Sequence, residues 1–200
     1  MDNKEKLLSD DLLKPNNMIR LYASGAFPMA ESQTGHINWY MPEIRCIIPL
    51  DNFNIPRSLK KSAEILNYEI RYDSDYLSVI KYCSARKETW ISEKLIDAYN
   101  RLYKRGHLHT VETWKDNMLV GGLYGITFRG AFFGESMFSL VSQASKIALI
   151  HLVNRLKDKN FVLLDVQYLT DHLKMFGAVE IVWDEYQSML RESYIVNSEF

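Results

Sequence analysis

The sequence predicts an α/β protein with a mixed β-sheet, divided into a small N-terminal domain over residues 1–50 and a larger domain over residues 51–200. Three observations predict this class. Hydrophobic residues make up 47% of the 200-residue chain and charged residues 24%, as in an ordinary globular protein with its own core. Three strand-like segments separated by short turns indicate an antiparallel meander. The C-terminal third alternates helix and strand patterns.

The first fifty residues have the pattern of a small, loop-rich unit. A short helical pattern surrounds residues 18–22, and a turn-rich stretch follows at residues 24–28. Residues 38–42 form an aromatic stretch without regular periodicity. We therefore expect Trp39 and Tyr40 to lie in an irregular segment.

Regular helix and strand patterns begin after Pro56. The predicted elements are a helix over residues 57–66, a strand over 68–72, a helix over 76–84 and an amphipathic helix over 92–105. Ser92 is a suitable N-cap for the last of these helices, and Gly106 ends it.

The meander and the alternating segments complete the chain. The predicted strands of the meander cover residues 109–115, 118–128 and 131–138, and the remaining elements are a helix over 144–157, a strand over 161–166, a helix over 170–176, a strand over 178–183 and a helix over 185–191. This order matches the acetyltransferase-like α/β core, in which a mixed sheet opens beside the helix after its fourth strand and takes an acyl donor there.

Composition and motif spacing exclude several classes of protein. No window approaches the roughly 18 apolar residues of a membrane span, and the charged N-terminus is unlike a signal peptide. Cys46 and Cys83 are far apart, as expected for reduced thiols of a cytoplasmic protein. The five histidines lack the spacing of a metal site, and the sequence has neither a nucleophile elbow nor a phosphate-binding loop.

Charge is distributed unevenly although the formal net charge is only −1. Residues 51–115 carry more Lys and Arg than Asp and Glu, whereas residues 116–200 carry more acidic residues. A polyanion should therefore approach the middle of the chain, although an imbalance of this size is also typical of an ordinary solvated face.

Two polar intrusions interrupt otherwise apolar strands. Glu135 lies within an aromatic segment, and Asp165 and Gln167 lie two residues apart near the end of a buried strand. Side chains two apart on a strand share a face, so neighbouring strands could bring these three together beside a cleft. The alternative is that Asp165 only ends its strand and Glu135 forms a salt bridge at the surface.

Aromatic residues form a second unusual set, made up of Trp39, Tyr40, Trp90 and Trp114. Such side chains more often belong to a core than to a ligand platform. Trp39 and Tyr40 lie in the segment predicted to be irregular, and Trp90 comes just before a helix. Aromatics in these positions can stack on a nucleic-acid base.

Several motifs in register resemble the leucyl/phenylalanyl-tRNA–protein transferases. The resemblance extends from about residue 22 to residue 181. Its motifs are Glu-Thr-Trp-Ile at 88–91, Gly-His-Leu-His-Thr-Val-Glu-Thr-Trp at 106–114, Leu-Val-Gly-Gly-Leu-Tyr-Gly at 119–125, Gly-Glu-Ser-Met-Phe-Ser at 134–139, Ala-Ser-Lys at 144–146 and Asp-Val-Gln at 165–167.

The resemblance implies the same two-domain arrangement and a specific reaction. Leu or Phe, or Met as a further donor, passes from the tRNA 3′ end to the α-amino group of a protein that begins with Arg or Lys, which marks that protein for N-end-rule degradation in bacteria. The implied partners are Leu-tRNA or Phe-tRNA and an acceptor protein or peptide. We expect a cytoplasmic monomer that needs no cofactor and no metal and does not bind a membrane.

Roles for individual residues follow from this chemistry. Asp165 would accept the proton of the attacking amine, Gln167 would hold Asp165 or relay to it, and Glu135 would orient the acceptor. Three further sets are expected: a donor side-chain pocket of Met137, Phe132, Leu123 and Leu149, an adenosine site of Trp90, Trp39 and Tyr40, and tRNA phosphate contacts from Arg57, Lys60, Lys61, Arg86 and Lys87.

The chain departs from the family pattern at a few positions. Met29 replaces a Trp, Tyr40 replaces the second Trp of a pair, and Val166 replaces a Cys. The helix with Arg57 continues with Glu64 and Ile65, where relatives often have further basic residues. These changes leave the reaction intact and affect the choice of donor and acceptor.

Two other functions remain open from the residues alone. An acyl-CoA acetyltransferase of the same fold should have a glycine-rich loop before the helix at residue 144, and residues 142–146 contain no glycine. A non-catalytic module that binds tRNA ends or basic N-termini would tolerate Asp165→Asn, whereas a transferase that uses Asp165 as its base would not. A transferase with a shifted acceptor range, such as acidic N-termini, is a further alternative.

Overall fold

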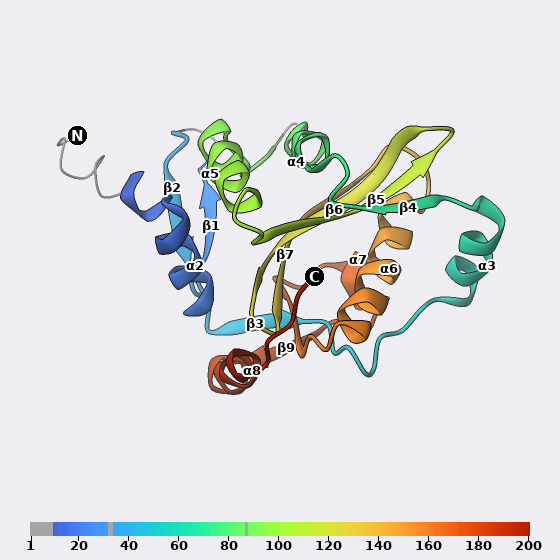
Figure 1. Cartoon of the computed structure of the whole chain (residues 1–200). Helices are drawn as coiled ribbons and strands as arrows, with labels where there is room; N and C mark the ends of the chain where they lie inside the picture. Colours follow the sequence, from blue (N-terminus) through green and yellow to red (C-terminus); the bar gives the residue numbers. More distant parts are fainter. Residues whose placement is uncertain (1–9, 32–33, 87) are drawn as a thin grey trace.

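The computed structural model describes residues 10–31, 34–86 and 88–200 and confirms a mixed α/β fold (Figure 1). The helices are α2 (Pro15–Ala23), α3 (Arg57–Leu66), α4 (Tyr76–Ser84), α5 (Glu93–Tyr103), α6 (Ala144–Asp158), α7 (Asp171–Lys174) and α8 (Trp183–Ile195). The strands are β1 (Phe27–Ala30), β2 (Ile37–Tyr40), β3 (Ile44–Ile47), β4 (Glu69–Tyr72), β5 (Leu108–Lys115), β6 (Met118–Phe128), β7 (Ala131–Ser139), β8 (Leu163–Gln167) and β9 (Val179–Val182).

Seven strands form the main sheet in the order β4-β5-β6-β7-β8-β3-β9, and β1 and β2 form a separate hairpin. Strands β7 and β8 pair in parallel, and the other neighbours in the sheet pair antiparallel. The meander predicted from the sequence is therefore confirmed as β5-β6-β7. The acetyltransferase-like classification of this sheet stays a prediction.

Local signals in the sequence explain why these elements begin and end where they do. Asp116 and Asn117 take φ angles of 50° and 58°, as a tight hairpin turn requires. The Ser92 hydroxyl accepts a hydrogen bond from the amide of Leu95 at the start of α5. Gly106, with a φ of 71°, follows the end of the same helix.

The prediction for the aromatic stretch was wrong. Ile37–Tyr40 is strand β2 and pairs with Phe27–Ala30, so that Trp39 lies opposite Pro28. A four-residue strand is too short to show a clear alternation, and its partner lies beyond a loop. The final helix is also longer than predicted, since α8 extends over Trp183–Ile195.

Strand β3 connects the first fifty residues to the main sheet. Its residues, Ile44–Ile47, lie between β8 and β9 and pair with both. The sequence did not predict this strand. Strand β3 precedes residue 50 and yet belongs to the larger sheet. The domain boundary at residue 50 stays a prediction.

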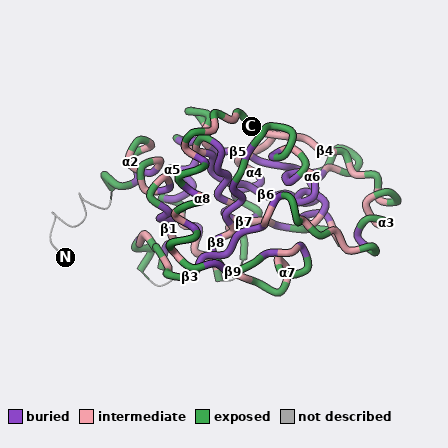
Figure 2. Tube along the Cα trace, turned by 90° about the horizontal axis from the view of Figure 1, so that it is seen from below, coloured by how far each residue is buried: buried purple, intermediate pink, exposed green. Residues whose placement is uncertain are grey.

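Helices cover both faces of the sheet and enclose two hydrophobic clusters. Figure 1 shows α4 and α5 on one face and α6 on the other, and Figure 2 shows the central strands as a continuous buried region. Gly121 permits the close approach of α6, because a Cβ atom there would lie 2.4 Å from the Cβ of Ala144. The packed scaffold thus fixes β7, β8 and α6 relative to one another.

Candidate functional site

A cavity of about 430 Å³ opens where β7 and β8 stop pairing. The parallel pairing runs from Ala131 opposite Leu163 to Phe133 opposite Asp165, and no further pairs join the two strands among the described residues. The next residues of each strand line the cavity, from Gly134 to Met137 on β7, and Val166 and Gln167 on β8. The separation of β7 from β8 therefore creates the cavity.

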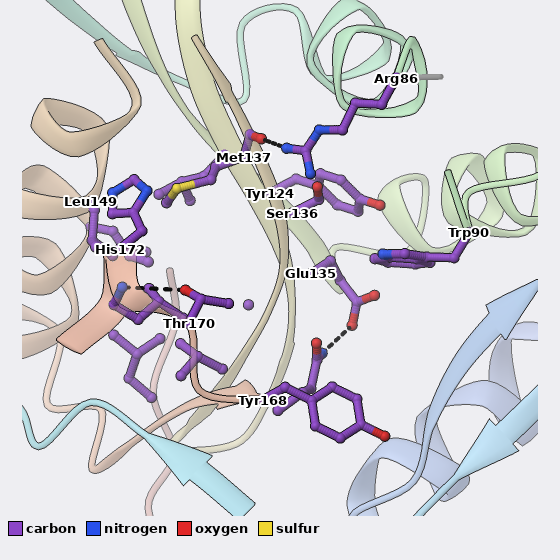
Figure 3. A pocket seen from close by; sticks show the side chains of 17 residues that line it. Arg86, Trp90, Tyr124, Glu135, Ser136, Met137, Leu149, Tyr168, Thr170 and His172 are labelled. Atoms are coloured by element: carbon purple, nitrogen blue, oxygen red, sulfur yellow. Dashed lines mark hydrogen bonds between the residues drawn. The ribbon is translucent and has the colours of Figure 1, made fainter. Parts of the chain in front are cut away.

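The cavity has one polar end and one apolar end. Figure 3 shows Trp90 and Tyr168 on the Glu135 side, and Met137, Leu149 and His172 at the opposite end. The complete lining consists of Arg86, Trp90, Leu123, Tyr124, Gly134, Glu135, Ser136, Met137, Leu149, Leu152, Leu164, Val166, Gln167, Tyr168, Thr170, His172 and Leu173.

A β-bulge places Glu135 at this position. Tyr124 of β6 pairs with Ser136 and Gly125 pairs with Gly134, so Glu135 is the extra residue of β7. The bulge shifts the alternation of the strand, and Phe133 and Phe138, an odd number of residues apart, both belong to the same core. The alternation of side chains expected for a regular strand could not reveal this shift from the sequence.

The Glu135 carboxylate lies within a ring of hydrogen-bond donors. Its Oε1 accepts hydrogen bonds from the Tyr22 hydroxyl at 2.9 Å and the Gln167 side-chain amide at 3.1 Å. Its Oε2 accepts one from the Tyr99 hydroxyl at 2.8 Å. Only 8% of Glu135 is exposed, and Tyr22 and Tyr99 are fully buried. The carboxylate is thus held rigidly at the edge of the cavity.

Burial raises the pKa of Glu135 to about 7. The hydrogen bonds from Tyr99 and Tyr22 oppose this rise, whereas the nearby Asp165 charge adds to it. The pKa values of both tyrosines are themselves raised, first by burial and then by the Glu135 charge, so they stay protonated and continue to donate. Glu135 can therefore exchange a proton near neutral pH.

Asp165 does not line the cavity, which differs from its expected role as the proton acceptor. Its side chain is fully buried and forms an ion pair with Arg45, whose Nη2 lies 2.6 Å from Oδ2 and whose Nε lies 2.9 Å from Oδ1. The Tyr186 hydroxyl donates to Oδ2 at 2.7 Å. An acceptor amine in the cavity cannot reach this carboxylate directly.

Asp165 nevertheless determines the backbone geometry of Gln167. The amide of Gln167 donates to Asp165 Oδ1 at 2.9 Å, and Gln167 has a φ of 63°, which non-glycine residues adopt rarely. In this conformation the Gln167 side chain reaches Glu135. Asp165 and Gln167 thus lie on the same face of β8, as expected, since both contact the side of the sheet that holds Tyr22 and Tyr186, and Asp165 holds the backbone of the residue that contacts Glu135.

Three of the four residues expected in the donor pocket line the apolar end of the cavity, namely Leu123, Met137 and Leu149. Phe132 does not line it. The ring of Phe132 is fully buried on the same side of the sheet as α6, 5.6 Å from the ring of Phe200.

The aromatic residues are divided in a similar way. Trp90 lines the cavity, whereas Trp39 and Tyr40 do not. Trp39 packs edge-on against Tyr22 at 5.7 Å, and Tyr40 lies 6.2 Å from the ring of Phe27. Tyr168, which is 47% exposed, lies at the cavity instead.

The expected phosphate contacts occupy two separate places. Arg86 lines the cavity and donates a hydrogen bond to the backbone carbonyl of Met137 (Figure 3). Arg57, Lys60 and Lys61 are exposed on α3, which lies at the opposite end of the molecule from α2 (Figure 1). Lys87 lies outside the described residues.

Several residues of the site were not predicted from the sequence. They are Arg45, Tyr22, Tyr99, Tyr168 and His172. Only Arg45 gave a usable signal, as a charged residue between the apolar residues Ile44 and Cys46. The two tyrosines belong to regular apolar stripes of α2 and α5, where a core role is the ordinary interpretation.

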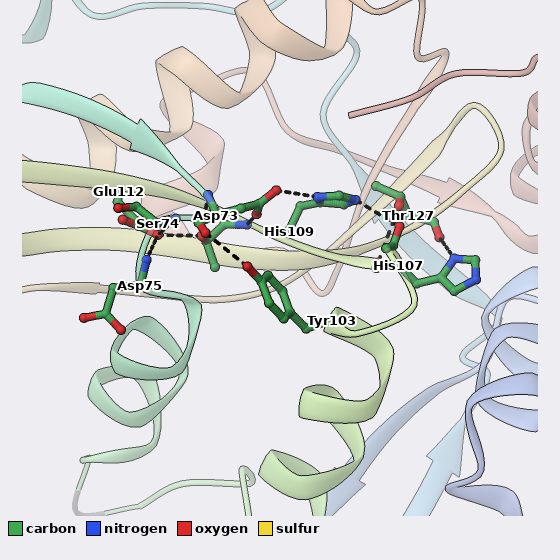
Figure 4. A network of polar contacts seen from close by, with 10 residues as sticks. Asp73, Ser74, Asp75, Tyr103, His107, His109, Glu112 and Thr127 are labelled. Carbon is green, nitrogen blue, oxygen red and sulfur yellow. Dashed lines mark hydrogen bonds and ion pairs between the residues drawn. The ribbon is translucent and has the colours of Figure 1, made fainter.

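A second polar network supports α4 rather than the cavity (Figure 4). The buried Glu112 carboxylate accepts hydrogen bonds from the backbone amides of Ser74 and Asp75 at 2.9 and 2.8 Å. Asp73 pairs with His109 at 2.8 Å. These contacts fix the turn that begins α4, and Arg86 follows the other end of that helix.

Residues 10–31, 34–86 and 88–200 hold no group of three or more His, Cys, Asp or Glu side chains arranged to bind a metal ion. They also include no helix long and apolar enough to cross a membrane. Burial raises the pKa values of Cys46 and Cys83 to about 12, so both thiols stay protonated at neutral pH.

Glu135→Gln should change the pH dependence of stability. A carboxyl group with a pKa near 4.5 when unfolded and about 7 when folded binds more protons in the folded state between these values. The wild type should therefore lose stability relative to Glu135→Gln as the pH rises from 4.5 to 7, by on the order of 3 kcal/mol. Urea unfolding of both proteins at pH 5 and pH 8 measures this difference. The exposed Glu64→Gln is the control, and a constant difference between wild type and Glu135→Gln would contradict the account.

Sequence comparisons match the chain to a known protein family. The family model of the leucyl/phenylalanyl-tRNA protein transferases matches residues 47–191, and the model of their N-terminal domain matches residues 11–43. A leucyl/phenylalanyl-tRNA–protein transferase from Salinibacter ruber is 42% identical over 190 residues, which cover 95% of this chain and 84% of that protein.

Two solved structures show remote likeness. A functionally unknown conserved protein from Staphylococcus epidermidis has a TM-score of 0.46 at 11% identity, over 84% of this chain and 64% of that chain. L-PGS from Bacillus licheniformis has a TM-score of 0.42 at 13% identity, over 80% and 55% of the two chains. Neither likeness bears on function. The matches in sequence show that the chain belongs to the leucyl/phenylalanyl-tRNA–protein transferase family.

Proposed function

We propose that this protein transfers Leu or Phe from the 3′ end of its tRNA to the α-amino group of a protein that begins with Arg or Lys. The observation that carries the proposal is one cavity with a buried, hydrogen-bonded carboxylate at one end and an apolar pocket at the other. Family membership makes this reaction the first candidate.

The reaction requires positioning more than activation. The amine nitrogen bonds to the ester carbonyl carbon, the bond from that carbon to the ribose 3′ oxygen breaks, and the amine loses one proton while the 3′ oxygen gains one. An α-amino group with a pKa near 8 is partly neutral at pH 7, so the enzyme needs to align the reactants and move a proton.

Glu135 and Gln167 are the polar groups at the position where these reactants would meet. Glu135, with a pKa of about 7, can bind the ammonium form of the acceptor or take its proton. Gln167 donates to Glu135 and fixes its orientation. Asp165 is a positioning residue in this proposal, because it is buried against Arg45 and holds the Gln167 backbone.

The apolar end would receive the donor side chain. Leu123, Met137 and Leu149 line it, and a flexible Met side chain adapts to both Leu and Phe. Polar side chains would lose their hydration there without finding partners. Trp90 and Tyr168, at the other end of the cavity, offer faces for the terminal adenosine.

The proposal also covers contacts with the tRNA body, oligomeric state and location in the cell. The exposed basic residues of α3, Arg57, Lys60 and Lys61, would meet phosphates of the tRNA body. We also propose that the protein acts as a monomer. We also propose a location in the cytoplasm, where charged tRNA and proteins that begin with Arg or Lys are found. The role proposed there is in N-end-rule degradation.

Transfer of radiolabelled Leu from Leu-tRNA to peptides that differ only in their first residue tests the proposal. The panel begins with Arg, Lys, Asp, Glu or Met and includes Arg with an acetylated amine. We expect incorporation into the Arg and Lys peptides and none after acetylation. Transfer to Asp or Glu peptides would keep the reaction and overturn the acceptor assignment. No transfer to any peptide, with Leu-tRNA still bound, would favour a binding module instead.

Leu149→Phe should alter the choice of donor. The larger ring reduces the apolar end of the cavity, so transfer of Phe should fall more than transfer of Leu, by about tenfold in the ratio of kcat/KM values. Phe132→Leu is the matched control, since Phe132 does not line the cavity and should leave the ratio unchanged. An equal loss of both donors in Leu149→Phe would show that Leu149 does not touch the donor side chain.

A further inference from the structure

A trough continues from the side of the cavity that Arg86, Met137 and His172 line, toward the start of α6. Two further hollows of about 370 and 460 Å³ make up this trough. His172 lines both of them and the main cavity, while Arg86 and Met137 line the cavity and the nearer hollow. Ser139 and Ser145 line both hollows. The three spaces therefore lie next to one another and share lining residues.

The charge of this trough is positive although the whole chain is slightly acidic. Arg86 and Lys146 line it, and no carboxylate does so among the described residues. Burial lowers the pKa of His172, and the Lys146 charge lowers it further, so the ring is neutral near pH 7 and acts through hydrogen bonds. A bound anion would thus meet two cationic side chains and, among the described lining residues, no competing carboxylate.

Polar atoms of the trough are also left without partners. Among the described residues, His172 Nε2 and Gln143 Oε1 are buried and form no hydrogen bond. Gln143 has a φ of 68°, just before α6 begins. Buried polar atoms normally find a partner, so these two atoms are suited to groups of a bound ligand.

An exposed aromatic ring completes the trough. Tyr82 stacks on Phe138 with ring centroids 4.8 Å apart, and 41% of Tyr82 remains exposed. An aromatic face beside cationic side chains is the combination that binds single-stranded nucleic acid, since the face stacks on a base and the cations meet the phosphate.

We propose that this trough, made up of Tyr82, Arg86, Ser139, Ser145, Lys146 and His172, binds the phosphodiester and the base of the nucleotide that precedes the terminal adenosine of the tRNA. The inference rests on the proposed function. It separates the site into a cavity for the aminoacyl-adenosine and a trough for the next nucleotide, with Arg86 and His172 at the junction.

Three leucyl donors test this division, each in transfer to an Arg-peptide. They are 3′-O-leucyl-adenosine, which has no phosphate, the dinucleotide cytidylyl-(3′-5′)-3′-O-leucyl-adenosine, and full Leu-tRNA. Lys146→Gln should raise KM about tenfold for the dinucleotide and for Leu-tRNA and leave the nucleoside donor unchanged. It should also reduce the slope of log KM against log salt by about 0.7 for the dinucleotide.

Two control variants lie on the same helix. Lys146→Arg should restore most of the affinity, and Lys157→Gln, at the exposed far end of α6, should behave as the wild type. An equal effect of Lys146→Gln on all three donors, or no effect on the dinucleotide, would overturn the inference. Coenzyme A supplies the alternative source of phosphate, and inhibition by coenzyme A that Lys146→Gln abolishes would assign the trough to a different ligand.

The wild type distinguishes failure of this inference from failure of the proposed function. If the wild type transfers Leu from Leu-tRNA and the Lys146 variants do not discriminate among donors, only the trough is wrongly assigned. If the wild type transfers Leu from none of the three donors, the proposed function itself is wrong.

Discussion

The ion pair between Arg45 and Asp165 is the interaction on which the site depends. Both side chains are fully buried, and the guanidinium lies between the rings of Phe27 and Tyr186, at 4.5 and 4.8 Å. The pair joins β3 to β8, and these rings tie it to β1 and α8. Removal of one partner of such a pair leaves a buried charge and costs about 3–5 kcal/mol. Four elements therefore share one electrostatic constraint.

This constraint reaches the cavity through the backbone. Asp165 accepts the amide hydrogen of Gln167 and stabilises its positive φ, and Gln167 in turn donates to Glu135. The β7 bulge brings Glu135 to the same place from the other strand. A buried pair and a bulge thus hold two polar side chains at the point where β7 and β8 part, with the apolar pocket beside them.

Most of the fold could be predicted from local patterns. The meander, α3, α5 and α6 follow from periodicity, caps and turns, and the structure confirms them. Strands β2 and β3 could not be predicted, because β2 lies in an aromatic stretch without clear alternation and β3 pairs with strands that are distant in the sequence. Short strands are determined by tertiary pairing rather than by their own composition.

The site was predictable in part, because a polar or charged residue in an apolar strand signals a special environment. Glu135, Asp165 and Gln167 gave this signal, and the structure brings them into one connected network. Their roles could not be assigned from the sequence. The depth of Asp165 depends on Arg45, which is 120 residues away, and the direction of Glu135 depends on the bulge. Trp39 and Tyr40 could not be separated from Trp90, since aromatic type alone does not distinguish a core from a platform.

Single-turnover transfer by Asp165→Asn and Asp165→Ala tests the positioning role of Asp165 most directly. The Asn side chain keeps an oxygen that can accept the Gln167 amide hydrogen, whereas Ala removes it. We predict that Asp165→Asn, measured where unfolding curves show it to be folded, retains a rate within about tenfold of the wild type, and that Asp165→Ala loses about a hundredfold or more. A comparable loss in both folded variants, with donor binding retained, would show that the Asp165 charge itself takes part in the reaction and would contradict the account.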